Sequence, residues 1–201
     1  MTTVIKMLDE SIEVKIIFVG NANVGKTSIA SRFINGTFSN ILEPTVGAAF
    51  SSKEVELNGV KCTFNLWDTA GQETYRYLVP MYYRNADIAV IVFDLSNQSS
   101  FNDVETWVED VKKNVGESIV FLLCGNKCDI DPKVVDIDSI SSLSRRMGLI
   151  YVETSASNGD GISKLFEIAI SEHLKKKDEK SKMPSNSVNV ATKTNKDKGC
   201  C

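Results

Sequence analysis

Short apolar runs of strand length alternate along the chain with longer segments of helical period. Six runs rich in β-branched and aromatic residues are predicted to be strands: Val14–Val19, Ala48–Leu57, Val60–Leu66, Ile88–Phe93, Ile119–Leu123 and Leu149–Glu153. The Asn58-Gly59 pair between the second and third runs fits a type I′ hairpin, which makes one strand antiparallel. The other connections are long enough for helical crossovers. The pattern therefore predicts an α/β fold, with a six-stranded, mostly parallel sheet and five helices on its two faces.

Two helical segments carry apolar residues three or four positions apart, and both stripes are expected to face the core. They consist of Phe101, Val104, Trp107, Val108 and Val111, and of Ile162, Leu165, Phe166, Ala169 and Ile170. After Lys177 the composition turns polar, and too few apolar residues remain to offset the entropy of ordering. We expect a folded domain over residues 12–177, a flexible start (residues 1–11) and a disordered tail (residues 178–201).

Length and composition limit the chain to one globular domain, because its 201 residues, 42% of them apolar, can bury one substantial core. No apolar run approaches the length of about 18 residues that a membrane-spanning helix needs. The acidic start lacks the pattern of a secretory signal, so we expect a cytosolic protein.

The net charge of −3 is unevenly distributed. Residues 175–201 carry eight lysines against three acidic residues, a net of +5, which leaves −8 for the rest of the chain. An acidic body argues against nucleic acid as the main partner, and a basic tail favours an anionic membrane surface. A merely solvated lysine-rich end remains the alternative.

The five cysteines show no disulfide framework, and we expect no disulfides. Cys62 and Cys124 lie in apolar runs and are expected to be packing residues. Cys128 could join Cys124 only as half of a zinc site, which the single His173 cannot complete. The Cys200-Cys201 pair stands apart, because it ends a polar tail that offers it no core.

A phosphate-binding motif follows the first predicted strand. Residues Gly20–Thr27 match G-x-x-x-x-G-K-S/T in the strand-loop-helix context that this motif requires. The glycines allow the backbone to wrap around phosphate oxygens, Lys26 supplies a point charge to the β- and γ-phosphates, and the Thr27 hydroxyl can bind Mg²⁺. The alternative is a glycine turn with an exposed lysine and a purely structural role.

The third predicted strand leads into Asp68-Thr69-Ala70-Gly71-Gln72. D-x-x-G is uninformative alone, but here an apolar strand places it beside the phosphate loop. Asp68 can hold the Mg²⁺ shell through water, Gly71 can turn its N–H onto the γ-phosphate, and Gln72 can orient an attacking water. The alternative is the capped start of the following helix.

Asn126-Lys127-Cys128-Asp129 follows the fifth strand, at the sheet edge where open α/β folds bind ligands. A carboxylate at Asp129 can accept from both N1–H and the exocyclic amine of guanine, whereas adenine leaves it unpaired. The loop Glu153–Ala156 can donate a backbone N–H to guanine O6. A polar turn is the alternative, and a P-loop kinase or ATPase would share the phosphate loop but not Asp129.

These four motifs, in this order, resemble the Ras-like small GTPases over residues 12–177. The chain is most similar to the Rab family in its segments Thr45–Phe50 and Trp67–Glu73 and in its double-cysteine end. Gly47–Phe50 and Pro80–Arg84 are most similar to the endosomal branch, the Rab-five and Rab-twenty-one group.

The resemblance implies roles that the pattern alone does not supply. Thr45 would complete the Mg²⁺ site with Thr27 and Asp68, and Phe38 would stack on guanine. Phe50, Trp67 and Tyr82 would form the surface that effectors recognise, whereas without the resemblance they would be ordinary core. Cys200 and Cys201 would be geranylgeranylated, since two lipid chains give stable anchoring. The nucleotide-binding set then comprises Ala22, Asn23, Val24, Gly25, Lys26, Thr27, Ser28, Phe38, Thr45, Gly71, Asn126, Lys127, Asp129, Ser155, Ala156 and Ser157.

The expected function is a GTP-binding and GTP-hydrolysing switch of vesicle and endosomal traffic, with Gln72 and Lys26 as catalytic residues. No arginine stands out as acting in cis, so intrinsic hydrolysis should be slow and depend on a GTPase-activating protein (GAP). The other implied partners are an exchange factor, a GDP-dissociation inhibitor, Rab escort protein, geranylgeranyltransferase and effectors. We expect a monomer on the cytoplasmic face of endosomal membranes, cycling with the cytosol. A Rab of another membrane route or a non-hydrolysing scaffold would share most of these features.

Three residues depart from the usual Rab pattern. Asn23 replaces a glycine-type position of the phosphate loop, which could alter intrinsic hydrolysis. Thr74 replaces an arginine, which affects contacts with a GAP or exchange factor. Ser157 replaces a lysine whose stem would cover the base, so we expect nucleotide release to be faster than typical.

Overall fold

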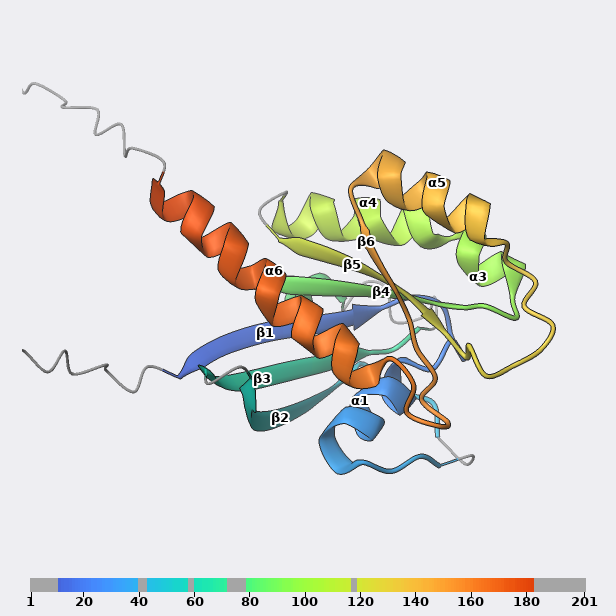
Figure 1. Cartoon of the computed structure of the whole chain (residues 1–201), viewed down its shortest axis with the longest axis horizontal. Coiled ribbons are helices and arrows are strands. Elements are labelled where there is room, and N and C mark those ends of the chain that lie inside the picture. Colours follow the sequence, from blue (N-terminus) through green and yellow to red (C-terminus); the bar gives the residue numbers. More distant parts are fainter. Residues whose placement is uncertain (1–10, 40–42, 58–59, 72–78, 117–118, 183–201) are drawn as a thin grey trace, which may run out of the picture.

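The computed structural model describes residues 11–39, 43–57, 60–71, 79–116 and 119–182, and in these ranges strands and helices alternate except at β2-β3 and α3-α4 (Figure 1). The strands are β1 (Ile12–Val19), β2 (Ala48–Leu57), β3 (Val60–Thr69), β4 (Ile88–Asp94), β5 (Val120–Asn126) and β6 (Ile150–Glu153). The helices are α1 (Lys26–Asn35), α2 (Val79–Tyr83), α3 (Gln98–Asn102), α4 (Val104–Val115), α5 (Ile137–Met147) and α6 (Ile162–Lys182). All six predicted strands are confirmed.

The strands form one sheet in the order β2-β3-β1-β4-β5-β6. β2 pairs with β3 in antiparallel register, and every other neighbouring pair is parallel, as the sequence predicts. The Asn58-Gly59 turn itself lies outside the described residues. Because β1, β3, β4, β5 and β6 run the same way, the loops that follow them gather at one edge of the sheet.

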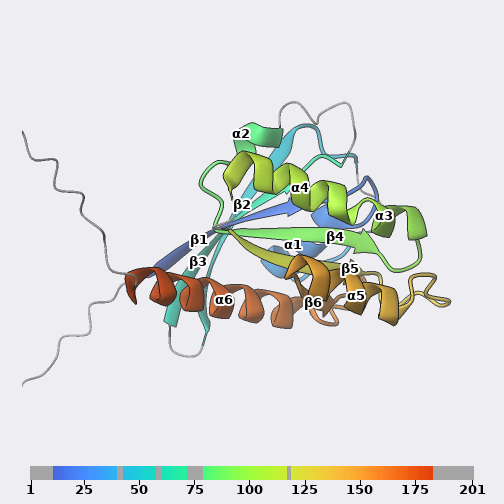
Figure 2. The same ribbon diagram turned by 90° about the horizontal axis from the view of Figure 1, so that it is seen from above.

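Two hydrophobic cores cover the two faces of this sheet. Successive residues of a strand point to opposite faces, so Val14, Ile16 and Phe18 of β1 enter one core while Ile17 and Val19 enter the other. The first core packs against α1 and α6, where the rings of Phe33 and Phe166 stack 3.5 Å apart. The second packs against α2 to α5. Figure 2 shows α4 and α6 on opposite sides of the sheet.

The helix expected around Phe101–Val111 is divided at Asp103 into α3 and α4. The Asn97 side chain accepts from the backbone N–H of Ser99 and Ser100 and starts the five-residue α3. The apolar stripe continues across the break, because α3 and α4 bury their apolar residues in the same core. Helices therefore cover both faces as predicted, with the third in two pieces.

α6 continues to Lys182, five residues beyond the predicted domain end at residue 177. The first five residues of the expected tail, 178–182, are therefore helical. Lys and Glu are good helix formers, and Lys175 pairs with Glu172 one turn earlier at 2.6 Å. Residues 1–10 and 183–201, with Cys200 and Cys201, lie outside the described ranges.

Cys124 and Cys128 are free thiols, and Cys62 and Cys124 are buried in the core as expected. In the described part of the chain, no group of three or more His, Cys, Asp or Glu side chains could hold a metal, so Cys124 and Cys128 gain no zinc partners. Within the same residues, no helix is both long and apolar enough to cross a bilayer.

Candidate functional site

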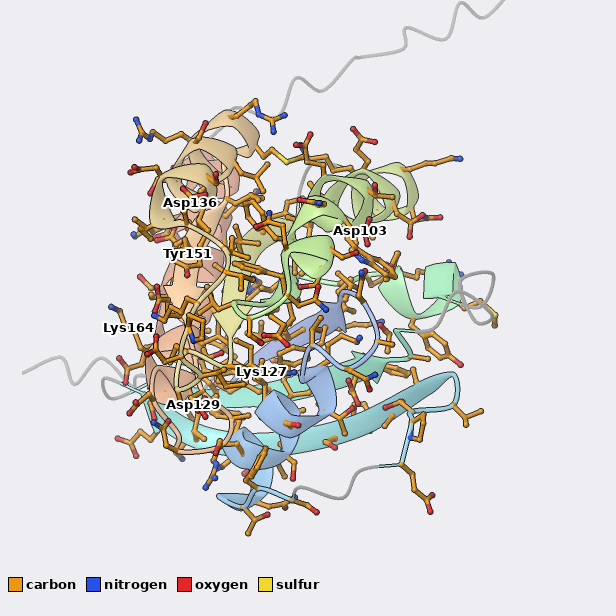
Figure 3. All side chains as sticks on the ribbon, turned by 90° about the vertical axis from the view of Figure 1, so that its right-hand side faces the viewer. Asp103, Lys127, Asp129, Asp136, Tyr151 and Lys164 are labelled. Carbon is orange, nitrogen blue, oxygen red and sulfur yellow. The ribbon has the colours of Figure 1, made fainter. Side chains whose placement is uncertain are left out.

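The loops that follow β1, β3, β5 and β6 enclose a pocket of about 550 Å³. Figure 3 looks onto this edge of the sheet, where Lys127 and Asp129 follow β5. The pocket is lined by most of the nucleotide-binding set expected from the sequence: Ala22, Asn23, Gly25, Lys26, Thr27, Ser28, Phe38, Thr45, Gly71, Asn126, Lys127, Asp129, Ala156 and Ser157. Residues far apart in the chain thus meet at one cavity.

Some expected residues lie elsewhere. Val24 and Ser155 are buried behind the pocket wall, and Ser155 shapes its loop by accepting from the N–H of Asn158 at 3.2 Å. Gln72 and Thr74 lie outside the described residues. The sequence analysis missed further lining residues, most of which belong to the segment before β2 or follow a motif residue: Ser39, Glu43, Pro44, Thr69 and Ile130.

The phosphate loop turns through two left-handed residues before α1 begins. Gly25 caps α1 with φ 97°, and a Cβ there would lie 2.2 Å from the Asn126 Nδ2. Asn23 has φ 64°. Asparagine is among the few non-glycine residues that adopt this region readily, so the loop tolerates this departure from glycine. No side chain caps α1, so its first N–H groups and positive dipole end suit an anion.

Lys26 is an almost completely buried cation at the centre of this loop. Its Nζ donates to the carbonyls of Gly20 at 2.7 Å and Asn21 at 2.8 Å. Burial lowers the pKa of Lys26 to about 8, although the nearby Asp68 carboxylate opposes this shift. The side chain therefore remains mostly protonated at neutral pH, as a phosphate ligand must be.

Three oxygen-bearing side chains converge beside Lys26. Thr27 and Thr45 both donate to Asp68 Oδ2, at 2.7 and 3.2 Å, and their hydroxyls lie 3.0 Å apart. The second carboxylate oxygen of Asp68 is buried with no hydrogen-bond partner. Burial raises the pKa of Asp68, while Thr27, Lys26 and Thr45 act in the opposite direction.

A buried carboxylate with one unpartnered oxygen, and with two hydroxyls on its other oxygen, suits a small, hard cation. Mg²⁺ prefers oxygen ligands and is typically held by one or two carboxylates together with substrate phosphates and water. The residues present at Thr27, Thr45 and Asp68 therefore fit the magnesium site expected from the sequence.

Gly71 brings the end of β3 against the phosphate loop. A Cβ at this position would lie 2.5 Å from both the Asn21 carbonyl oxygen and the Lys26 Nζ. Only glycine allows this approach, which places the Gly71 backbone beside the phosphate loop.

The Asn126 side chain joins three loops of the site. Its Nδ2 donates to the carbonyl of Val24 at 2.8 Å, and its Oδ1 accepts from Thr154 Oγ1 at 3.1 Å and from the N–H of Ala156 at 3.3 Å. The side chain is buried, so these bonds are shielded from water. Asn126 thus holds the phosphate loop and the loop after β6 in one arrangement.

Lys127 and Asp129 form the outer part of this wall. Lys127 has φ 63° and its Nζ lies 2.6 Å from the carboxylate of Asp94. Burial alone would raise the pKa of Asp94, but hydrogen bonds from Lys127 and Ser96 outweigh it, and the pKa is lowered overall. Asp129 is exposed at the pocket, with its carboxylate available to a ligand.

The phosphate loop is also anchored from outside the pocket, by a contact that the sequence analysis missed. The Asn21 side chain donates to Asp103 at 2.6 Å and accepts from the indole N–H of Trp107 at 2.7 Å. Asp103 is the residue that separates α3 from α4 (Figure 3). The break between these helices therefore lies beside the phosphate loop and supports it.

Phe50, Trp67 and Tyr82 form a continuous row of rings on β2, β3 and α2. The ring centroids of Phe50 and Trp67 lie 5.2 Å apart, and those of Trp67 and Tyr82 lie 5.7 Å apart. Phe50 is 56% exposed. The structure thus brings together the three residues that the resemblance assigned to effector contact.

Comparison with known proteins agrees with this geometry. The family model that matches the chain, over residues 15–175, is that of the Ras family. The chain belongs to the Ras family. It is 39% identical to GTP-binding protein YPT53 of Saccharomyces cerevisiae over 164 residues, which cover 78% of the chain and 74% of that protein.

This Ras-family chain is also similar to Rab proteins of animals and plants. It is 41% identical to Ras-related protein Rab-31 of Mus musculus over 156 residues, 77% of the chain and 80% of that protein. It is 39% identical to Ras-related protein RABF2b of Arabidopsis thaliana over 163 residues, 80% of the chain and 82% of that protein. The chain is therefore a Rab-type small GTPase, which confirms the predicted resemblance and removes the kinase and ATPase alternatives.

Proposed function

We propose that this small GTPase is a nucleotide-dependent switch of vesicle traffic at endosomal membranes. The observation that carries the proposal is the single pocket shared by the phosphate loop, the cluster of Thr27, Thr45 and Asp68, and the loop from Asn126 to Asp129. The phosphate loop binds phosphates, the cluster of three oxygen-bearing side chains would hold a cation, and the loop after β5 binds a base.

Guanine is the base that this wall suits. Asp129 accepts from N1–H and from the exocyclic amine of guanine, and adenine offers it neither donor. The N–H of Ala156 makes a long hydrogen bond of 3.3 Å to Asn126 Oδ1. The same N–H can share this bond with guanine O6. Phe38, 37% exposed at the pocket, stacks on the ring.

Phosphate binding and nucleotide sensing use the inner part of the pocket. Lys26 binds the β- and γ-phosphates, and Thr27, Thr45 and Asp68 would hold Mg²⁺, which neutralises phosphate charge when bound. Thr45 lies in the segment before β2 and Gly71 at the end of β3, so a γ-phosphate draws both segments toward the phosphate loop. GTP and GDP thereby give two conformations.

Hydrolysis depends on Gln72, which orients the attacking water, and on charge neutralisation by Lys26. Among the described residues that line the pocket there is no arginine. Intrinsic turnover is therefore slow, and a GAP that supplies the missing charge accelerates it. An exchange factor reverses the switch by releasing GDP.

Effectors recognise the row of Phe50, Trp67 and Tyr82. Thr45, before β2, and Gly71, after β3, respond to the nucleotide at the ends of the strands that carry two of these rings. Geranylgeranyl groups on Cys200 and Cys201, added by geranylgeranyltransferase with Rab escort protein, anchor the chain to the membrane. A GDP-dissociation inhibitor that covers both lipids returns it to the cytosol.

The first experiment identifies the nucleotide that co-purifies with the chain and measures single-turnover GTP hydrolysis with and without Mg²⁺. We expect one guanine nucleotide per chain and slow hydrolysis that depends on Mg²⁺. Protein without guanine nucleotide would contradict the assignment of Asn126 and Asp129. Stoichiometric GTP without turnover would instead favour a non-hydrolysing scaffold.

The role of Gln72 is tested with a GAP present. Gln72→Leu should remain in the GTP form, because no side chain then orients the water, whereas the control Gln98→Leu on the exposed surface of α3 should hydrolyse normally. Equal hydrolysis by Gln72→Leu and the unsubstituted chain would refute the role.

Thr27→Asn should favour the GDP or nucleotide-free form, since it removes one oxygen of the cation site.

The membrane route is tested with a fluorescent fusion at the N-terminus. We expect it on endosomes, with the double substitution Cys200→Ser and Cys201→Ser leaving it in the cytosol. Localisation of the intact chain to secretory or plasma membranes would assign it to another route.

A further inference from the structure

Arg32, near the end of α1, binds both the loop after β6 and the loop after α1, which none of the four motifs connects. Its Nε donates to the carbonyl of Ala156 at 2.8 Å and its Nη2 to that of Ser157 at 2.5 Å. On the other side of the guanidinium, Nη1 donates to the carbonyl of Gly36 at 2.8 Å. One planar side chain therefore uses three donors on three carbonyls, two of them more than 120 residues away.

Both loops held by Arg32 reach the pocket. Ala156 and Ser157 line the pocket after β6, and Phe38, two residues beyond Gly36, lines it as well. The guanidinium carbon lies 6.0 Å from the centroid of the Phe38 ring, within the range of a cation–π contact. Arg32 itself is not among the lining residues, so it acts on the pocket only through these neighbours.

The loop after β6 is held from two sides. Asn126 accepts from the N–H of Ala156, while Arg32 binds the carbonyl of the same residue. The N–H of Ala156 belongs to the peptide group before this residue and the carbonyl to the peptide group after it, so Asn126 and Arg32 fix the loop on both sides of the Ala156 Cα. Ser157 provides no long side chain of its own to support the loop, so Arg32 supplies that support from α1.

We propose that Arg32 is a positioning residue for the guanine base: it keeps the loop of Ala156 and Ser157 where the Ala156 N–H can share its bond with O6, and it keeps Phe38 over the ring. This inference rests on the proposed function, in which the pocket binds guanine nucleotide. Arg32 controls how long the base stays bound, and it leaves the hydrolysis of bound GTP unaffected because it contacts neither the phosphate loop nor the cation cluster.

The test measures nucleotide release from the full chain in Mg²⁺. The protein is loaded with GDP, excess GDP carrying a fluorescent ribose label is added, and the rise in fluorescence reports departure of the first nucleotide. Arg32→Met keeps the apolar stem and removes all three hydrogen bonds, and we expect release about tenfold faster, since charge-assisted bonds are worth a factor of ten or more. Arg32→Lys keeps the charge but not the fork, and should be about threefold faster.

The matched control is Arg145→Met on the exposed side of α5, which should release GDP as the unsubstituted chain does.

Two further measurements distinguish positioning of the base by Arg32 from a general loosening of the fold. Single-turnover hydrolysis of bound GTP should change less than about twofold in Arg32→Met, since the bonds of Arg32 reach only the base loop and the end of α1. Release of the 2-aminopurine riboside diphosphate, which lacks O6, should accelerate clearly less than release of GDP.

The inference is overturned if the unsubstituted chain binds GDP and both Arg32 variants release it at the control rate, and the proposed function then stands. It is also overturned if hydrolysis changes as much as release, or if the analogue without O6 accelerates as much as GDP. Failure of the unsubstituted chain to bind GDP would overturn the proposed function and the inference together.

Discussion

Removing the Asn126 side chain should loosen the whole site at once. In Asn126→Ala, the bonds to Val24, Thr154 and Ala156 are lost, each with a net worth of about 1 kcal/mol. Val24 and Ala156 are buried, so their backbone groups lose a partner that water does not easily replace. We therefore expect the free energy of unfolding to fall by about 3 kcal/mol or more.

This change is large for a domain of this size. Each kcal/mol shifts the unfolding midpoint of a chain of 150 to 250 residues by about 2–4 °C, so the midpoint should fall by roughly 6–12 °C. The assay is urea and thermal unfolding of nucleotide-free protein, prepared with a Mg²⁺ chelator, followed by the same measurement with GDP and Mg²⁺. Added GDP should stabilise the variant less than the unsubstituted chain, because the base wall is no longer fixed.

Asn114→Ala provides the control. Asn114 is an exposed asparagine whose side chain bonds within α4, to Asp110 at 2.7 Å, so its loss should change the free energy of unfolding by no more than about 0.5 kcal/mol. An Asn126→Ala variant as stable as Asn114→Ala would refute the reasoning, since it would show that the three bonds contribute nothing net.

Three further predictions concern other parts of the site. Gly71→Ala should lower single-turnover GTP hydrolysis at least about tenfold while GDP still binds. The new Cβ would lie 2.5 Å from the Asn21 oxygen and push β3 from the phosphate loop. Unchanged turnover would show that hydrolysis does not need the close approach of Gly71 to the phosphate loop. Because the pKa of Asp94 is held below its ordinary 3.8, its stabilisation is complete above that value and lost as pH falls through the lower pKa of the folded state. The stability difference between Asp94→Asn and the unsubstituted chain, measured by urea unfolding, should therefore be greatest above pH 3.8 and shrink in more acid solution, and a difference constant with pH would contradict the contact with Lys127. Ser157→Lys should slow GDP release, since the lysine stem covers the base, and an unchanged release rate would remove our reason for expecting rapid release in this chain.

The sheet could be predicted from the sequence because apolar runs mark strands buried on both faces. The ends of the strands were less predictable, since pairing rather than hydropathy sets them. β3 continues past Leu66 to Thr69 because Trp67 and Asp68 still pair with β1 and Thr69 with β2. The division at Asp103 left no mark on the apolar pattern, because Phe101 and Val104 enter the same core on either side of it.

The pocket could be predicted to the extent that its chemistry depends on motifs with fixed spacing. Lys26, Thr27, Asp68 and Asn126 belong to such motifs, and all four approach the site as expected. Arg32 was missed because it binds backbone carbonyls, which every residue has and which therefore leave no sequence signal. Such contacts depend on which segments the fold places side by side, and only the folded chain shows them.

The direction of α6 determines from which side of the domain anything attached beyond its C-terminal end departs. The helix starts after the loop Thr154–Gly161 at the nucleotide edge of the sheet and runs back along the sheet to the opposite edge (Figures 1 and 2). Its 21 residues span about 30 Å at 1.5 Å per residue. A tether that begins beyond Lys182 therefore leaves from the pole farthest from the pocket, so attachment at this end leaves the pocket uncovered.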